Sequence, residues 1–234
     1  MNVIKTGIKP LDDLIGGWGR GVMTLLVGET GVGKSTLLIS SALKAVENGV
    51  KVFYLDVEGN IAGDKVPGGL TVELANVSME ELEEAVSKLS KLPQSAIKDS
   101  LIIVDSVTYH YHALIRMARE EKDRDRLQAA LENVVYRLHG ITVRNNTATI
   151  LSTWPTSMLE EESDFIGGFA VKTYTRIQLR MEFTELDRVR RIRVIKHPDI
   201  SKYGSSALIR LEDLAQAVFK PAGEVVEREP EAVG

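Results

Sequence analysis

The segment "LLVGETGVGKSTLL", Leu25 to Leu38, constrains the fold of this chain more than any other stretch. Residues 28–35 match the pattern G-x-x-x-x-G-K-[ST]. They follow a short apolar run that predicts a buried strand, and they precede residues 34–49, whose apolar spacing predicts a helix. In this context successive backbone N–H groups form an anion nest, and the helix N-terminus adds its positive end. The segment therefore predicts a phosphate-binding loop in an α/β core.

The side chains of this loop have separate expected roles toward a bound nucleotide. Lys34 should reach the β- and γ-phosphates and act in catalysis, and the Ser35 hydroxyl should coordinate Mg²⁺. We expect ATP, with GTP as the alternative, and Mg²⁺ as cofactors. A glycine-rich turn that binds nothing is disfavoured by the flanking elements. The expected nucleotide-binding residues are Gly28, Glu29, Thr30, Gly31, Val32, Gly33, Lys34, Ser35 and Thr36.

Two acidic positions supply the remaining chemistry. Asp105 ends the apolar run "LIIVD", so its carboxylate should lie beside the loop and coordinate Mg²⁺ directly or through water, unless it only begins a turn. A serine follows Asp105 where many ATPases have a glutamate, so the catalytic base must come from elsewhere. Glu58, after the strand pattern "FYLDV", is the expected base. Asp56 is its rival, and Glu58 could instead cap a helix or turn.

Composition limits the classes of protein to consider. The chain has 234 residues, 44% of them hydrophobic and 26% charged, which is typical of a soluble globular protein with one sizeable domain. No apolar run is long enough to span a bilayer. Cysteine is absent, which excludes disulfides and fits the cytoplasm. The net charge of −4 means that any nucleic-acid contact depends on a local basic patch.

Alternating patterns along the chain predict the fold class. Strands are expected at residues 51–59, 100–106 and 147–154, and helices after the N-cap Ser78 and from about Arg124 to His139. Three later segments, residues 172–183, 188–198 and 206–213, alternate apolar and charged residues as half-exposed antiparallel strands do. We expect one core domain, residues 1–220, with a mostly parallel twisted sheet flanked by helices and an antiparallel C-terminal extension. Residues 221–234 should form a disordered tail.

These motifs resemble those of the RecA/RadA superfamily. The stretch "TGIKPLDDLIGGWGRGVMTLLVGETGVGKS" is similar to the opening of the RecA-type core in archaeal RadA and its paralogues. "YLDVEG" resembles the family's strand with the catalytic glutamate, and "LIIVDSVT" resembles its metal-binding strand. "IGGFAVKTYTRIQLRMEF" and "RRIRVIKHP" resemble its glycine pair, basic strand and ATP-capping turn. The resemblance runs from about Thr6 to Asp213.

The resemblance implies a RecA-type P-loop NTPase core. The chain begins at that core, without the N-terminal domain and polymerisation linker of RadA, so it is most similar to short archaeal paralogues of the RadB type. This implies a slow cytoplasmic ATPase that assists homologous recombination and DNA repair, as a monomer or small homo-oligomer, with a recombinase or other repair proteins as partners. Lys196 is implied as a cation that reaches the γ-phosphate of a neighbouring subunit, and without a neighbour it should be exposed. Arg190, Arg191 and Arg193 are expected to make ordinary ion pairs.

The two positions where the family contacts DNA differ in charge. The second, "PTSMLEEESDFIGG", carries four acids that repel a phosphate backbone, and Trp154 or a neighbouring hydroxyl stands where the family usually has glutamine. We therefore expect weak binding of DNA, more readily single-stranded, and no strand exchange by this chain alone. The first position is basic, although interleaved acids also allow a solvated helix. Its candidate DNA-binding residues are Arg116, Arg119, Lys122, Arg124 and Arg126.

Two further features leave alternatives open. "YHYHA", Tyr109 to Ala113, offers rings that could stack on bases, but its one-in-two pattern favours a sheet edge or an interface. The alternative function is a KaiC-like or archaellum-type regulatory ATPase that binds protein partners and not DNA. A chain that only binds nucleotide is disfavoured, because the sequence retains Lys34, Ser35, Glu58 and Asp105.

Overall fold

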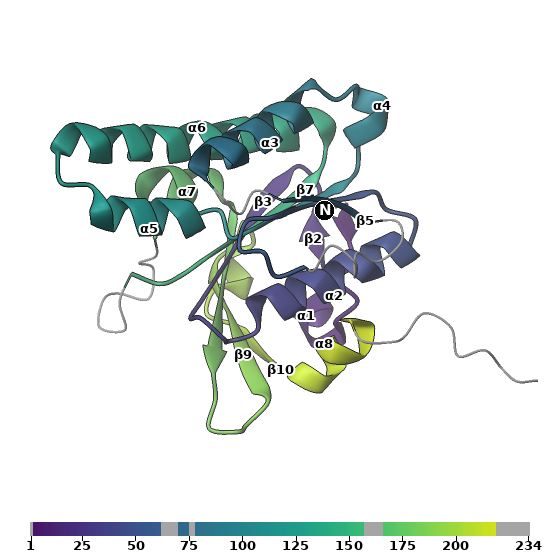
Figure 1. Ribbon diagram of the computed structural model, residues 1–234. Helices are drawn as coiled ribbons and strands as arrows, with labels where there is room; N and C mark the ends of the chain where they lie inside the picture. Colours follow the sequence, from purple (N-terminus) through teal and green to yellow (C-terminus); the bar gives the residue numbers. More distant parts are fainter. Residues whose placement is uncertain (1, 62–69, 75–77, 157–165, 219–234) are drawn as a thin grey trace, which may run out of the picture.

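The strand that precedes the glycine-rich loop, β3 (Val22–Gly28), lies in the middle of the sheet (Figure 1). The structure is a computed structural model that describes residues 2–61, 70–74, 78–156 and 166–218. Within these residues the main sheet has eight strands in the order β10-β9-β8-β3-β7-β6-β4-β5. The other strands are β4 (Val52–Asp56), β5 (Leu70–Leu74), β6 (Leu101–Asp105), β7 (Ala148–Thr153), β8 (Ile177–Phe183), β9 (Val189–Lys196) and β10 (Ser206–Arg210).

The pairing of the strands confirms the predicted fold class. β3 runs parallel to both β7 and β8, and the strands from β7 through β6 and β4 to β5 are also parallel. β9 pairs antiparallel with β8 and with β10, which makes the C-terminal extension. One expectation was wrong in detail. β8 is a mostly buried strand that is parallel to β3 on one side, because it joins the extension to the core, and residues 172–174 belong to helix α7 (Gly168–Tyr174).

Helices cover both faces of this sheet (Figure 1). One face carries α1 (Lys9–Ile15), α2 (Lys34–Glu47) and α8 (Leu211–Val218). The other carries α3 (Met79–Lys91), α6 (Glu121–Asn145) and α7, with the short α4 (Gln94–Ile97) at the end of α3. Helix α5 (Tyr109–Met117) precedes α6, a 3-10 turn covers Ile200–Lys202, and β1 (Val3–Ile4) pairs with β2 (Trp18–Gly19).

The two faces explain the sequence of the central strand. All seven residues of β3 are buried, and successive side chains point to opposite faces. Val22 and Leu26 join the core on the α2 side, whereas Met23 and Leu25 join the core on the α6 side. A strand that is covered by helices on both faces therefore has a continuous apolar sequence instead of an alternating one.

One predicted helix end agrees with the structure, whereas two helices differ from the prediction. The Ser78 hydroxyl accepts a hydrogen bond from the Glu81 amide at 3.2 Å, which confirms it as the N-cap of α3. α6 is longer than expected, mainly at its end, because Ile141, Thr142 and Asn145 continue its buried face, and it ends at the left-handed Asn146. Residues 109–117 form α5, so "YHYHA" does not line a sheet edge, and its place at an interface stays a prediction. The predicted tail, residues 221–234, lies outside the described residues.

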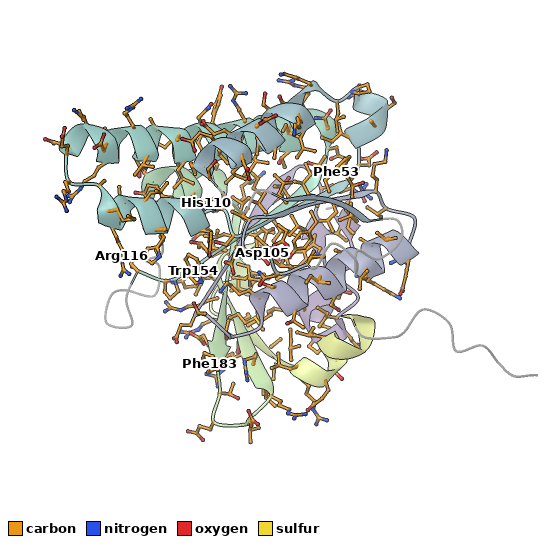
Figure 2. All side chains as sticks on the ribbon, in the orientation of Figure 1. Phe53, Asp105, His110, Arg116, Trp154 and Phe183 are labelled. Atoms are coloured by element: carbon orange, nitrogen blue, oxygen red, sulfur yellow. The ribbon has the colours of Figure 1, made fainter. Side chains whose placement is uncertain are left out.

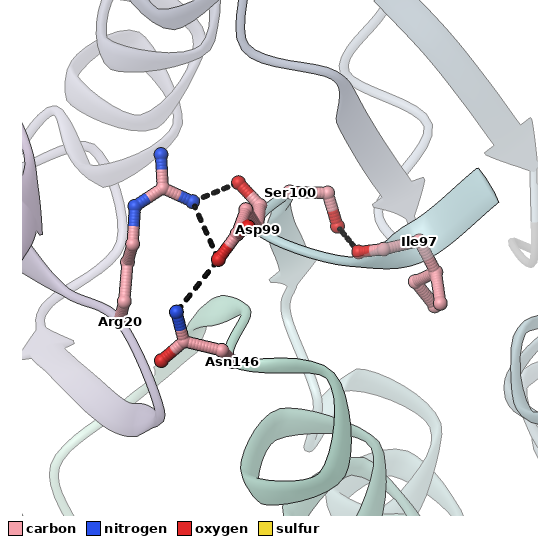
Figure 3. A network of polar contacts seen from close by, with 5 residues as sticks. All are labelled: Arg20, Ile97, Asp99, Ser100 and Asn146. Carbon is pink, nitrogen blue, oxygen red and sulfur yellow. Dashed lines mark hydrogen bonds and ion pairs between the residues drawn. The ribbon is translucent and has the colours of Figure 1, made fainter. Parts of the chain in front are cut away.

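A polar network ties together three turns at the sheet edge opposite the glycine-rich loop (Figure 3). The Arg20 guanidinium, before β3, donates to the carbonyl of Asp99 and lies 3.8 Å from its carboxylate. Asn146, after α6, donates to the same carboxylate at 2.6 Å. Ser100, beside Asp99, donates to the Ile97 carbonyl at 2.6 Å. The network therefore fixes how β3, β6 and β7 begin.

Loss of the central cation should weaken the fold. The side chain of Arg20 is only 14% exposed, so Arg20→Ala removes a largely buried cation and its hydrogen bond to the Asp99 carbonyl, and it should lower the free energy of unfolding by about 1–3 kcal/mol. Urea denaturation measures this change. The control is Lys9→Ala, whose ion pair with Asp13 is 86% and 66% exposed and should contribute less than about 1 kcal/mol. Equal effects of the two substitutions would contradict the structural role of Arg20.

Candidate nucleotide-binding site

The glycine-rich loop turns directly from β3 into α2. Gly31 and Gly33 have φ angles of +78° and +106°, a region that side chains other than glycine rarely enter. Gly28 is required for a different reason, because a Cβ atom there would lie 2.9 Å from the Met181 carbonyl oxygen. The loop is thus held close to β8, and its backbone is shaped by the two glycines that the motif predicts, Gly28 and Gly33, and by Gly31 at a position that the motif leaves open.

Lys34 is the first residue of α2, and its ammonium group is held against the loop. It is 6% exposed and donates hydrogen bonds to the carbonyls of Gly28 at 2.8 Å and Glu29 at 3.0 Å. Burial lowers the pKa of Lys34, while the negative charges of Glu58, Asp105 and Glu29 act in the opposite direction. An ammonium group has three donors, so one N–H remains for a phosphate oxygen.

Asp105 ends β6 with its side chain fully buried. Its two carboxylate oxygens accept hydrogen bonds from the Tyr54 hydroxyl, at 2.9 Å, and from the Ser152 hydroxyl. Burial raises the pKa of Tyr54 well above its ordinary value, and the charge of Asp105 adds to this effect, so the phenol stays a donor. The backbone carbonyl of Asp105 also accepts from the amides of Val57 and Glu58. β6 therefore positions both expected acids.

The turn after β4 distinguishes Glu58 from Asp56. The carboxylate of Asp56 is fully buried and accepts from the backbone amides of Asn60, at 3.0 Å, and Ile61, at 2.7 Å. Asp56 therefore holds the turn together. Among the described residues, Glu58 Oε1 is buried with no hydrogen-bond partner. Burial, and then the charge of Asp105, raise the pKa of Glu58, whereas the Asn60 amide and Lys34 lower it.

Asn60 is a site residue that the sequence analysis missed. Its side-chain amide donates to Ser35 Oγ at 3.2 Å and to Glu58 Oε2 at 3.4 Å. It therefore connects the expected metal-binding hydroxyl with the expected base. In the sequence, Asn60 follows "DVEG" and has the composition of an ordinary turn. Only the contact with α2 gives it a second role.

Trp154 lies where β7 ends, beside Asp105 and near α5 in the view of Figure 2. The Lys34 ammonium is 6.0 Å from the centroid of the Trp154 ring, and the rings of His112 and Tyr109 are 5.4 and 5.8 Å from it. An open pocket of about 570 Å³ adjoins this cluster and is lined by Glu29, Thr30, His112, Arg116, Trp154, Pro155, Thr156 and Ile166. The aromatic cluster thus joins the glycine-rich loop to α5.

The five candidate DNA-binding cations lie on α5, on the α5–α6 connection and on the first turns of α6. Arg116 is on α5 and lines the pocket beside the loop, whereas Arg126 is on α6 and lines a groove of about 540 Å³ against α3. Arg119, Lys122 and Arg124 lie at the exposed α5–α6 connection, where Lys122 pairs with Glu120 at 2.6 Å. The acids of the second loop, Glu160, Glu161, Glu162 and Asp164, lie outside the described residues.

Lys196 is not simply exposed, as the sequence suggested. It is half-buried, and its ammonium donates to the carbonyls of Lys172, at 3.1 Å, and Thr175, at 2.8 Å. Both acceptors lie at the C-terminal end of α7, where a cation is favourable. Burial, and then the charges of Lys172 and Arg176, lower the pKa of Lys196. A role at a neighbouring subunit would require it to leave these two carbonyls.

The sequence and the fold of this chain are similar to those of known proteins. The DNA repair and recombination protein RadB of Thermococcus kodakarensis is 30% identical over 166 residues, which cover 64% of this chain and 69% of that protein. The chain belongs to the RadB family. RadB proteins of Methanococcoides burtonii and Thermoplasma acidophilum are each 28% identical, over 83% and 90% of this chain and 88% and 92% of theirs.

Two further comparisons agree with this RadB assignment. The family of the DnaB-like helicase C terminal domain matches residues 3–150, so the chain belongs to that wider family as well. A crystal structure of the RadB recombinase superposes with a TM-score of 0.72, over 91% of this chain and 97% of that one, at 22% identity. The RecA-type fold expected for the chain is therefore confirmed. Among the described residues, the helices are too short or too polar to cross a membrane.

The contact between Lys34 and Trp154 predicts an optical signal. The chain has two tryptophans, and Trp18 is fully buried away from the loop. A phosphate that draws the Lys34 ammonium should change the fluorescence of Trp154, because the charge lies 6.0 Å from the ring. Titration with ADP should show this change in the Trp18→Phe variant and not in Trp154→Phe. A signal that survives in Trp154→Phe would contradict the contact.

Proposed function

We propose that this RadB-family chain is an ATP-binding and slowly hydrolysing RecA-type ATPase that assists homologous recombination and DNA repair. The observation that carries the enzymatic part is the contrast between two neighbouring acids. The Asp56 carboxylate accepts hydrogen bonds from two backbone amides of the turn, whereas Glu58 has a buried carboxylate oxygen with no hydrogen-bond partner among the described residues. The names of the RadB relatives support the part in recombination and repair.

Each site residue has a defined part in this proposal. Lys34 and the loop amides bind the phosphates, and the N-terminus of α2 favours their negative charge. The Ser35 hydroxyl and the Asp105 carboxylate fit Mg²⁺, a hard cation that takes few protein ligands and keeps several waters. When bound, Mg²⁺ would offset the phosphate charge. The Asn60 amide donates hydrogen bonds to both Ser35 and Glu58 and so fixes their relative positions.

Glu58 is proposed to accept the proton of the attacking water. Burial makes its carboxylate more basic than an exposed one, and the nearby Lys34 ammonium favours the ionised form that a base requires. Hydrolysis by the isolated chain should be slow, because Lys196 already donates to two carbonyls of α7 and is not placed to stabilise the transition state. We propose a cytoplasmic monomer or small homo-oligomer, with residues 1–220 as one core domain and a recombinase or another repair protein as partner.

Replacement of the proposed base should separate binding from hydrolysis. Glu58→Gln keeps the volume but removes the proton acceptor, so it should bind ATP normally and hydrolyse it about 10²–10⁴ times more slowly. Steady-state kinetics and calorimetry measure the two quantities. Glu47→Gln, at an exposed ion pair of α2, is the matched control and should keep the wild-type rate. Lys34→Ala should lose ATP binding altogether.

The pH dependence gives the same proposal a second check. A general base works only when it is deprotonated, so the rate should fall as the pH is lowered through the pKa of Glu58. Because burial raises that pKa, the fall should begin at a higher pH than for an ordinary exposed glutamate. This fall in rate at low pH should be absent from the residual activity of Glu58→Gln. If Glu58→Gln hydrolysed ATP with wild-type kinetics, the general base would have to be another group.

We also propose weak binding of single-stranded DNA at the α5–α6 connection. The triple substitution Arg119→Ala, Lys122→Ala and Arg124→Ala should abolish this binding and spare ATP affinity. The salt dependence of the wild type should reflect about one counterion per phosphate contact. Arg144→Ala, exposed at the far end of α6, is the control and should bind like the wild type. Unchanged affinity in the triple variant, or joint-molecule formation by the wild type alone, would contradict the proposal.

A further inference from the structure

Arg190, on β9, is a buried cation that the mechanism above does not use. It is 8% exposed, and it forms no ion pair with any carboxylate of the described residues. Its Nε atom donates to the carbonyl oxygen of Val32, in the glycine-rich loop, at 3.0 Å. Its Nη1 atom donates to the neighbouring Val189 carbonyl at 2.9 Å. Burial of a guanidinium costs free energy unless it is hydrogen-bonded, and here one of its two hydrogen bonds goes to the loop.

The second support of this guanidinium is an aromatic ring. The Arg190 Cζ atom lies 4.7 Å from the centroid of Phe183, which is the residue that pairs with it on β8. Figure 2 shows Phe183 on the part of the molecule formed by the antiparallel strands, apart from Trp154 and Asp105. A cation over an aromatic face is attracted to it, and a planar guanidinium suits this geometry better than an ammonium. The hairpin of β8 and β9 therefore holds the donor in one orientation.

The peptide unit that Arg190 contacts joins Val32 to Gly33. Gly33 has a left-handed φ angle of +106°. Because one of its two flanking residues is a glycine, this unit rotates more easily than one between two residues with side chains. A trans peptide is planar, so its C=O and N–H point in opposite directions. A donor that fixes the Val32 carbonyl consequently fixes the direction of the Gly33 N–H. This N–H has no acceptor among the described residues and is one of the amides of the expected phosphate nest.

The C-terminal part of the chain also packs against the loop at Gly33. A Cβ atom at Gly33 would lie 3.0 Å from Leu211 Cδ2 and 3.3 Å from Met181 Cε. Met181 belongs to β8, and Leu211 begins α8 after β10. The C-terminal strands thus support the loop by packing at Gly33 and by a hydrogen bond at Val32.

We propose that Arg190 is a positioning residue of the phosphate-binding loop: it fixes the Val32–Gly33 peptide so that the Gly33 amide is directed at a nucleotide phosphate. The proposal rests on nucleotide binding as the proposed function. The positive charge of Arg190 also polarises this peptide and makes its N–H a stronger donor. The inference gives the antiparallel extension a direct part in nucleotide affinity, through a residue more than 150 positions downstream of the loop.

Calorimetry with ADP tests the proposal. Arg190→Met removes the donor and the charge and should weaken ADP binding by about tenfold or more, as expected for a charge-assisted hydrogen bond. Arg190→Lys keeps the charge and should lose less. The matched control is Arg193→Gln, because the Arg193 guanidinium on the same strand pairs with Glu182 instead of the loop. It should bind ADP like the wild type.

Amide NMR of the protein without nucleotide provides a readout that overall destabilisation would not produce. In Arg190→Met the Gly33 amide signal should shift and exchange faster with solvent, whereas in Arg193→Gln it should not change. If Arg190→Met does not fold, Arg190→Lys and Phe183→Leu serve for the same two measurements. Wild-type ADP affinity together with an unchanged Gly33 signal in the Arg190 variants would overturn the inference. If the wild type bound no nucleotide, the proposed function would fail, and the Gly33 signal would still decide the role of Arg190.

Discussion

The carbonyl oxygen of Asp105 accepts hydrogen bonds from two consecutive amides, those of Val57 and Glu58, at the point where β4 and β6 end. The contact sets how the chain leaves β4, and the Asp56 carboxylate then closes the following turn onto Asn60 and Ile61. Asn60 in turn contacts Ser35 at the start of α2. The relation between the two acids thus depends on main-chain hydrogen bonds between neighbouring strands, and the side chains of Asp56 and Asn60 extend this link to the loop.

Charge is distributed unevenly around this edge. Lys34 is surrounded by Glu58, Asp105 and Glu29, and each of these acids favours its charged form against the effect of burial. On the other side of the loop, Arg190 has neutral partners, a carbonyl and an aromatic ring. The loop therefore lies between one cation whose charge is balanced by acids and one whose charge is not. The second forms no ion pair with a carboxylate of the described residues.

The sequence was sufficient for those parts of the site that depend on nearby residues. The glycine-rich loop, the strands that end at Asp56 and Asp105, and the N-cap Ser78 each depend on residues close in the chain, so their patterns are visible without the fold. Asn60, Arg190 and the capping role of Lys196 depend on contacts between distant segments, and each looks like an ordinary turn residue or surface cation when read alone. The helix at residues 109–117 was missed for another reason. Its tyrosines and histidines alternate in the sequence, which resembles a strand pattern. In the structure the segment is a helix, and these side chains make separate contacts: His112 with Trp154, Tyr111 with Gln128, and His110 with Tyr109.

Trp154 has a consequence for how events at the phosphates reach α5. A glutamine side chain has both a donor and an acceptor, and it can exchange one hydrogen-bond partner for another. An indole has a single N–H and no acceptor, and the contacts of Trp154 with Lys34, Tyr109 and His112 are ring contacts. A signal through this residue is therefore carried by displacement of a rigid ring and by the position of one positive charge. A phosphate that displaces the Lys34 ammonium would therefore act first on the Trp154 ring, and through it on the rings of Tyr109 and His112 in α5.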